Sequence, residues 1–143
     1  MKGIQELISH LDPERPVVIQ AHDFPDHDAV ASAVALSGLL SENGVSSRLC
    51  YGGEIQSDSL AEAIRLLEIP ISSCSELGLN ERAQIVVVDG FIGNRNIQGM
   101  PGEVIGVIDH HKPPTEPDCP YWDIRPHYGS CSTILYEYYK IAK

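Results

Sequence analysis

The sequence predicts an α/β protein of three layers, with a mostly parallel β-sheet flanked by helices. Two observations lead to this fold. Runs of β-branched residues alternate with amphipathic segments, which is typical of repeated strand–helix–strand units. Apolar residues make up 43% of the chain but aromatic residues only 6%, and an aliphatic core suits a buried parallel sheet. The length of 143 residues fits one domain with a substantial core, which we expect to span 1–143.

The first half of the chain contains three predicted helices and two predicted strands. An opening helix is predicted by apolar residues at helical spacing, namely Ile4, Leu7, Ile8 and Leu11. A continuous apolar strand follows over 17–21, and an Ala- and Leu-rich helix over 29–40. Residues 46–51 predict the second strand. Ser59 and Glu62 have the spacing of a capping box, so they predict a third helix that begins there.

The second half contains the two clearest strands. A short strand is expected to start at Pro70-Ile71, and continuous Val/Ile runs predict strands over 85–88 and 103–108. Four prolines make 112–120 an extended loop without a helix. Residues 130–139 predict the final helix.

Charge and cysteine usage narrow the functional classes. The formal net charge is −10 and no basic run occurs, which argues against binding of a long nucleic acid. The acidity either keeps a cytosolic protein in solution or offsets bound cations. The cysteines show no C-x-x-C spacing, and neither a signal-peptide pattern nor a membrane-length apolar run is present. We therefore expect a soluble, cytoplasmic protein with reduced thiols and no membrane contact.

The first motif, His22 to Asp28, lies where the strand 17–21 meets the next helix. Parallel strands build their sites at their carboxyl ends. Asp26 and Asp28 can point in different directions from a loop, one toward each of two cations, and Mn²⁺ accepts both carboxylate and imidazole ligands. The alternative is that Asp26 caps the helix and His22 simply ends the strand. His27 either contacts substrate or is a solvated loop residue.

Two further strand ends carry acidic residues. Asp89 follows the strand 85–88 and is either a turn residue before Gly90 or a carboxylate that bridges two metals. Asp109 ends the strand 103–108, where an ionised carboxylate is costly unless it is hydrogen-bonded or close to a cation. His110 and His111 project differently, so one could bind metal while the other meets substrate. A surface or pH-sensing pair is the alternative.

A small-residue motif, Gly129-Ser130-Cys131-Ser132-Thr133, opens the final helix. Backbone N–H groups and hydroxyls at a helix N-terminus favour a phosphate, whereas the simpler interpretation is an ordinary Ser/Thr cap. Cys131 is expected to be a small packing residue and not a nucleophile.

Taken in order, these motifs resemble those of the DHH family of phosphoesterases, which is named for the tripeptide found here at Asp109–His111. The likeness runs from about Val17 to Tyr139. Within the family, the sequence most resembles the branch that contains oligoribonucleotide and pAp phosphatases, exopolyphosphatase-like proteins and manganese-dependent inorganic pyrophosphatases.

The resemblance implies a site for two metal ions, usually Mn²⁺, with Mg²⁺ as the alternative. His22, Asp26 and Asp89 would hold one ion, and Asp28, Asp89 and His110 the other. Asp109 and His111 would be the catalytic residues. His111 would face the scissile phosphate or its leaving group, and Asp109 would orient the neighbouring groups or contact the metal shell. Ser130 and Ser132, with His27, would contact the substrate and its phosphate. The ion pair would activate a water for in-line attack, so no protein nucleophile is required.

The sequence departs from the family pattern in two ways. His27 stands where relatives often carry Gly or Pro. Family members also continue into a strand with one more metal-binding Asp, usually followed by a second domain with a glycine-rich, basic motif that binds substrate. The sequence to Lys143 contains neither, so we expect a DHH domain without the C-terminal part and second domain usual in the family.

The leading functional hypothesis is a metal-dependent hydrolase of a phosphoester or phosphoanhydride bond. Its substrate would be small, such as a short oligonucleotide, pAp, a cyclic dinucleotide or polyphosphate. The alternative is a catalytically incomplete module that binds metal, nucleotide or a partner chain without turnover. A receiver-like domain with incidental acidic residues explains neither the adjacent histidines nor the Gly-Ser motif. Apolar surface left exposed on an open sheet predicts a homodimer.

Overall fold

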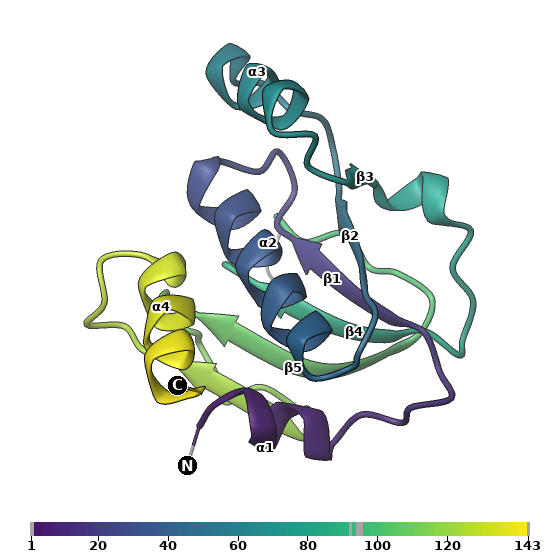
Figure 1. Cartoon of the computed structure of the whole chain (residues 1–143), viewed down its shortest axis with the longest axis vertical. Coiled ribbons are helices and arrows are strands. Elements are labelled where there is room, and N and C mark those ends of the chain that lie inside the picture. Colours follow the sequence, from purple (N-terminus) through teal and green to yellow (C-terminus); the bar gives the residue numbers. More distant parts are fainter. Residues whose placement is uncertain (1, 92, 94–95, 143) are drawn as a thin grey trace.

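The computed structural model describes residues 2–91, 93 and 96–142, and in it six parallel strands form one sheet (Figure 1). The sheet order is β3-β2-β1-β4-β5-β6. The elements are α1 (Ile4–Ser9), β1 (Val17–Ala21), α2 (His27–Glu42), β2 (Arg48–Tyr51), α3 (Asp58–Leu66), β3 (Ile71–Ser73), the 3-10 helix η1 (Cys74–Leu77), β4 (Gln84–Val88), β5 (Glu103–Asp109), β6 (Tyr121–Ile124) and α4 (Cys131–Ala142). The predicted three-layer α/β class is confirmed.

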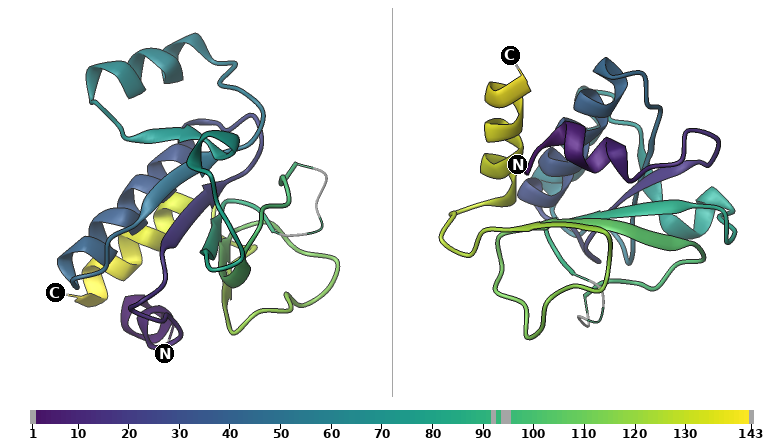
Figure 2. Two further views of the ribbon diagram at one scale, coloured as in Figure 1. Left: turned by 90° about the vertical axis from the view of Figure 1, so that its right-hand side faces the viewer. Right: turned by 90° about the horizontal axis from the view of Figure 1, so that it is seen from below.

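One face of the sheet is covered by α1, α2 and α4 (Figures 1 and 2). Leu36, Leu39 and Leu40 of α2 are fully buried there against alternate residues of β1 and β4. Full burial of each such side chain contributes roughly 1.5–3 kcal/mol. Packing on this face therefore fixes where α2 and α4 begin relative to the strand ends.

The opposite face has a layer of less regular structure. The 3-10 helix η1 covers β1 and β2 there, with Cys74 packed in one cluster with Val18 and Cys50. The segments that leave β4 and β5 cover the rest, and run below the sheet in the right-hand view of Figure 2. Among the residues that the structure describes, no helix is long and apolar enough to cross a membrane.

Three local features differ from the expectations. The strand β6 and the 3-10 helix η1 were not predicted, since each has only four residues and offers too short a pattern. The predicted capping box at Ser59 and Glu62 is wrong. The cap of α3 is Ser57, whose hydroxyl accepts the Leu60 N–H at 3.2 Å, so Ser59 already lies in the first turn.

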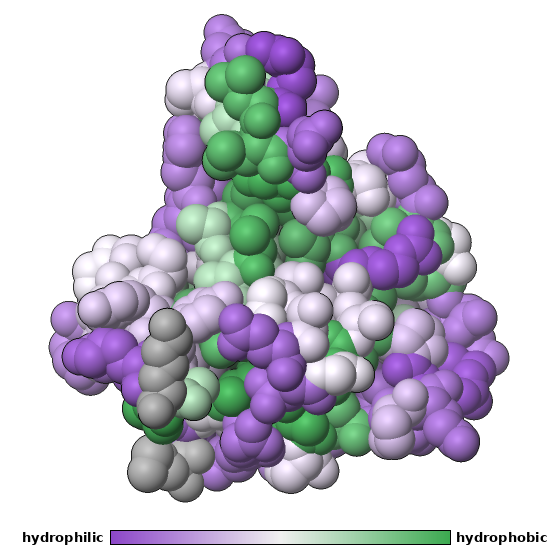
Figure 3. Space-filling model, in the orientation of Figure 1, coloured by the Kyte–Doolittle hydropathy of each residue, from purple (hydrophilic) through white to green (hydrophobic). Residues whose placement is uncertain are grey.

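Helix α3 extends away from the sheet, at the top of Figure 1. Only Leu60 is buried in it, while Leu66 and Leu67 at and just beyond its end are 64% and 72% exposed. The space-filling view shows apolar surface on this part of the molecule (Figure 3).

Candidate metal centre and active site

The order in which strands are added to the sheet reverses after β3. The strands β2 and β3 lie on one side of β1, and β4, β5 and β6 lie on its other side. Open α/β sheets bind ligands at such a switch point, which lies here between β1 and β4. In register, Ala21 of β1 lies beside Val88 of β4, and Val88 lies beside Ile108 of β5. The next residue of each strand therefore reaches the same edge. These residues are His22, Asp89 and Asp109.

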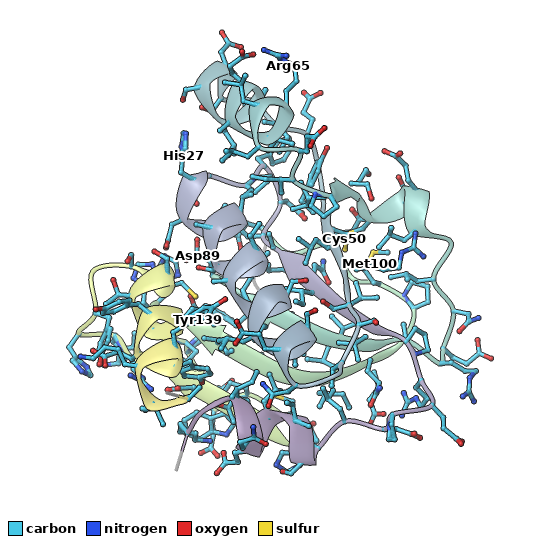
Figure 4. The ribbon with its side chains drawn as sticks, viewed as in Figure 1. His27, Cys50, Arg65, Asp89, Met100 and Tyr139 are labelled. Atoms are coloured by element: carbon cyan, nitrogen blue, oxygen red, sulfur yellow. The ribbon has the colours of Figure 1, made fainter. Side chains whose placement is uncertain are left out.

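Asp89 lies at the centre of this edge, close to where α2 and α4 begin (Figure 4). Its side chain is almost completely buried. Its backbone is left-handed, with a φ of 59°, and its N–H donates to the Ile108 carbonyl at 3.0 Å. Asp tolerates this conformation better than most residues. The turn aims the carboxylate into the site, and not out toward solvent.

The two oxygens of Asp89 face two different histidines. Oδ2 lies 3.5 Å from Nε2 of His22, and Oδ1 lies 3.2 Å from Nε2 of His110. Two groups of side chains therefore meet at one carboxylate, and we call them the first and second half-sites.

The first half-site consists of His22, Asp26 and Asp89, which offer ligand atoms within 4.8 Å of one another. Nε2 of His22 is 3.6 Å from Oδ1 of Asp26. That same oxygen accepts the Ala29 N–H at 2.9 Å, so Asp26 is also the N-cap of α2. Helix cap and metal ligand were alternatives for this residue, and the geometry allows both.

We take Asp28, Asp89 and His110, the predicted set, as the second half-site. Among the described residues, the ligand atoms that lie within 4.8 Å of one another at this end are those of Asp89, Asp109, His110 and His111, so Asp28 is outside that group. Nε2 of His110 lies 3.7 Å from Oδ2 of Asp28. Both oxygens of Asp28 are held by the start of α4, where the N–H groups of Cys131 and Ser132 donate to them at 2.9 Å each. The sequence suggested that backbone N–H groups at the start of α4 bind a phosphate. Two of them, those of Cys131 and Ser132, instead hold the Asp28 carboxylate.

Both histidines are oriented by backbone carbonyls. Nδ1 of His22 lies 2.8 Å from the carbonyl oxygen of Asp23, and Nδ1 of His110 lies 3.2 Å from that of Tyr128. With a proton on each Nδ1, each Nε2 is directed at the carboxylates and can bind a cation there in place of a proton. This arrangement is the usual one for a histidine that binds a metal.

The electrostatics of the cluster favour a cation. In the part of the chain that the structure describes, the buried Oδ1 of Asp89 receives no hydrogen bond, although Nε2 of His110 lies 3.2 Å from it. Burial raises the pKa of Asp89, and the nearby charges of Asp28 and Asp26 raise it further. Asp89 in turn raises the pKa of His22 to about 9. For Asp28, burial opposes ionisation, but the Ser132 and Cys131 N–H groups outweigh it and lower its pKa.

Asp109 and His111 form a separate pair at the same edge. Asp109 is fully buried, and its Oδ1 lies 2.8 Å from Nδ1 of His111. The side chain of His111 is 54% exposed, so its Nε2 is accessible to a substrate. Ligand atoms of Asp89, Asp109, His110 and His111 also lie within 4.8 Å of one another, which places this pair beside the second half-site.

The remaining predicted residues lie around this edge. Ser130 accepts the Thr133 N–H at 3.3 Å and so helps to cap α4, and its hydroxyl lies 3.3 Å from that of Ser132. His27 begins α2 and points toward α3 (Figure 4), with its Nε2 3.3 Å from the hydroxyl of Ser59.

A family model for the N-terminal domain of the DHH family matches residues 16–143. The chain belongs to the DHH family. It is also 35% identical, over 127 residues, to the uncharacterized protein MJ1633 of Methanocaldococcus jannaschii. The alignment covers 89% of this chain and 26% of that protein, so the chain spans about a quarter of the length of the relative it matches.

In this DHH domain, sequence reasoning missed the residues that orient the ligands. The Asp23 side chain accepts the Gln98 N–H at 3.0 Å and so links the loop after β1 to the segment after β4. The role of Tyr128 lies in its carbonyl. A backbone carbonyl gives no signal in the sequence, because every residue has one. For Asp23, the adjacent Gly52 is a signal, since any Cβ there would collide with its carboxylate.

Proposed function

We propose that this domain hydrolyses a phosphoester or phosphoanhydride bond in a small phosphorylated substrate, with the help of two bound divalent cations. The observation that carries the proposal is the position of Asp89, whose two oxygens face His22 and His110 separately. A single carboxylate between two imidazole-containing half-sites is suited to bridge a pair of ions.

The donor set favours Mn²⁺, with Mg²⁺ as the alternative. Carboxylate oxygens suit both ions, and Mn²⁺ also accepts imidazole nitrogen, which the oxygen-preferring Mg²⁺ takes less readily. His22, Asp26 and Asp89 would hold one ion, and Asp28, Asp89 and His110 the other. When bound, such ions lower the pKa of water and neutralise charge on the phosphate.

His111 would act at the leaving group. With its Nδ1–H donated to the buried Asp109 carboxylate, the ring would present Nε2 to the substrate. A proton on Nε2 could then pass to the departing oxygen. Asp109 would hold the ring in place, while Ser130, Ser132 and His27 would supply donors for the phosphate and the rest of the substrate.

The substrate class is small and phosphorylated, for which a short oligonucleotide, pAp, a cyclic dinucleotide and polyphosphate are the candidates. A net charge of −10 repels a long phosphate backbone, whereas a short substrate would be held at the edge of the sheet by the cations and the neighbouring donors.

The deciding experiment is the isosteric variant Asp89→Asn. It keeps the size of the side chain but removes the charge that both half-sites share. We expect Mn²⁺-dependent phosphate release to fall at least about 10³-fold on a panel of pyrophosphate, pAp, dinucleotides and polyphosphate. Glu81→Gln, at an exposed position, is the matched control. Phosphate release by Asp89→Asn at the parental rate would refute the assignment.

A second candidate function is a binding module without turnover. The observation that favours it concerns the charge of the site, because in the described residues the ion pairs of Asp26, Asp28, Asp89 and Asp109 are made by histidines and none by Lys or Arg. Such a site offers a transferring phosphate no fixed positive charge of its own. Release of many phosphates per chain in the presence of Mn²⁺ would eliminate this candidate.

A further inference from the structure

A network of polar side chains lies behind His110, outside the proposed set of ligands. At its centre is Asp123 of β6, which is buried. Arg125 donates to both of its oxygens, from Nε at 2.9 Å and from Nη2 at 2.8 Å. The hydroxyl of Tyr138 donates to Oδ2 at 2.6 Å. The buried charge of Asp123 is therefore fully paired, and the guanidinium of Arg125 is held in one orientation.

The third nitrogen of that guanidinium extends the network to Tyr128. Nη1 of Arg125 donates to the Tyr128 hydroxyl at 3.1 Å. The turn between the two residues is closed by the Tyr128 N–H, which donates to the Arg125 carbonyl at 3.0 Å. The Arg125 N–H donates in turn to the carbonyl of Asp109 at 3.0 Å. Tyr128 is thus fixed by both its ring and its backbone.

Because Tyr128 is fixed, its carbonyl oxygen is held 3.2 Å from Nδ1 of His110. His22 has a similar partner, but this carbonyl belongs to the next residue, Asp23, which lies outside the network around Arg125. His110 depends instead on a residue 18 positions away, whose place is set by the turn 125–128. The carbonyl that orients His110 therefore comes from a distant turn, which the network around Arg125 holds in place, whereas the carbonyl that orients His22 comes from the next residue.

We propose that Arg125 is a positioning residue for the second half-site, which it serves by holding the Tyr128 carbonyl on Nδ1 of His110. The inference rests on the proposed function, in which His110 binds a cation through Nε2. Arg suits this role because its planar fork can grip the Asp123 carboxylate with two nitrogens and still donate a third hydrogen bond, which Lys cannot do in the same geometry.

The test compares Arg125→Ala and Arg125→Lys with Arg65→Ala, a control on the exposed surface of α3 where the ion pair is with Glu62. Zn²⁺, a diamagnetic ion that binds imidazole and carboxylate, replaces paramagnetic Mn²⁺ in this titration, and the NMR signals of the His22 and His110 rings report binding at each half-site. Loss of an orienting partner typically weakens metal binding about 10–100-fold. We expect that loss at His110 for Arg125→Ala, a smaller loss for Arg125→Lys, and no change at His22 in either.

A second readout needs no cation. In the metal-free parental protein, the ¹⁵N shifts of His110 should show a proton on Nδ1, whereas Arg125→Ala should show a mixture of the two neutral forms. If Arg125 only stabilised the fold, Arg125→Ala would lower the melting temperature without changing the ¹⁵N shifts of His110. Because Arg125→Ala leaves Asp123 buried without its partner, the double variant Asp123→Asn/Arg125→Gln, which removes both charges together, is measured in parallel as a fold control.

The outcomes separate the two proposals. Unchanged Zn²⁺ binding at His110 and an unchanged ring form in a folded Arg125→Ala protein would overturn the positioning role while leaving the proposed function intact. A parental protein that binds no Mn²⁺ would overturn the proposed function, and the ring form of His110 would still decide what Arg125 does.

Discussion

Two carboxylates face Nε2 of His22, whose side chain is only 12% exposed. The interaction with Asp89 is the largest cause of its raised pKa, about 9 against an ordinary 6.5. In the absence of metal, a protonated His22 therefore offsets part of the negative charge of the site. A cation that binds Nε2 must displace that proton, so His22 links metal binding to pH.

The first prediction concerns the metal-free protein. Because the folded-state pKa of His22 is above the unfolded value, its stabilising contribution is complete below pH 6.5 and is lost as the pH rises through about 9. A rise of the pKa from 6.5 to about 9 corresponds to about 3 kcal/mol for a fully buried group, and solvent screening of the partly buried ring reduces it. We therefore expect the free energy of unfolding in the presence of a chelator to fall by on the order of 2 kcal/mol over this window.

Urea unfolding at a series of pH values measures this loss, with His22→Gln as the comparison that subtracts other titrating groups. A parental protein whose pH dependence matches that of His22→Gln would show that the proton on His22 contributes nothing to folding.

At the scale of single residues, the sequence could identify the side chains of the site but not the groups that orient them. His22, Asp26, Asp28, Asp89 and His110 all follow strand ends or open a helix, and the structure brings them together around Asp89. Their roles as ligands stay a prediction. The carbonyls that orient the histidines could not be predicted, because they depend on the conformation of distant turns and not on residue type.

At the scale of elements, the long buried strands were predictable because each is a continuous apolar run. The strands β1, β4 and β5 lie where the Val/Ile runs placed them. The start of α4 shows a contact that the sequence pattern does not predict. Its small, polar sequence is typical of a free helix N-terminus, yet two of its N–H groups bind Asp28, 103 and 104 positions away, and no local pattern encodes that contact.

The second prediction concerns the loop between β1 and α2, which packs against the turn after β2. A Cβ at Gly52 would lie 1.9 Å from Oδ1 of Asp23, the atom that accepts the Gln98 N–H. Gly52→Ala must therefore move Asp23, whose carbonyl orients His22. We expect Mn²⁺ binding at the first half-site to weaken about 10-fold, while binding at His110 stays unchanged.

Gly99→Ala is the matched control, since a Cβ there would meet no atom within 4 Å. Isothermal titration with Mn²⁺ compares the two variants. Equal affinities would mean that the Asp23 side chain moves aside without disturbing His22.

The whole molecule carries a formal charge of −10, and several of its carboxylates converge on one edge of the sheet. Self-association stays a prediction, which sedimentation can test against the monomer mass of 15.7 kDa. The exposed Leu66 and Leu67 beyond the body of the sheet are the residues to substitute if a dimer is found.

The last prediction is that cations stabilise the fold through the site and not through the overall charge. A ligand at 100 times its Kd adds about 2.7 kcal/mol for a single site, which raises the melting temperature of a domain of this size by roughly 10 °C. NaCl screens surface charges without occupying the half-sites, so it should give a much smaller shift than millimolar Mn²⁺. Asp89→Asn should lose the Mn²⁺ shift but keep the NaCl shift. An equal response of parent and variant to Mn²⁺, measured by thermal unfolding, would place the binding elsewhere on the acidic surface.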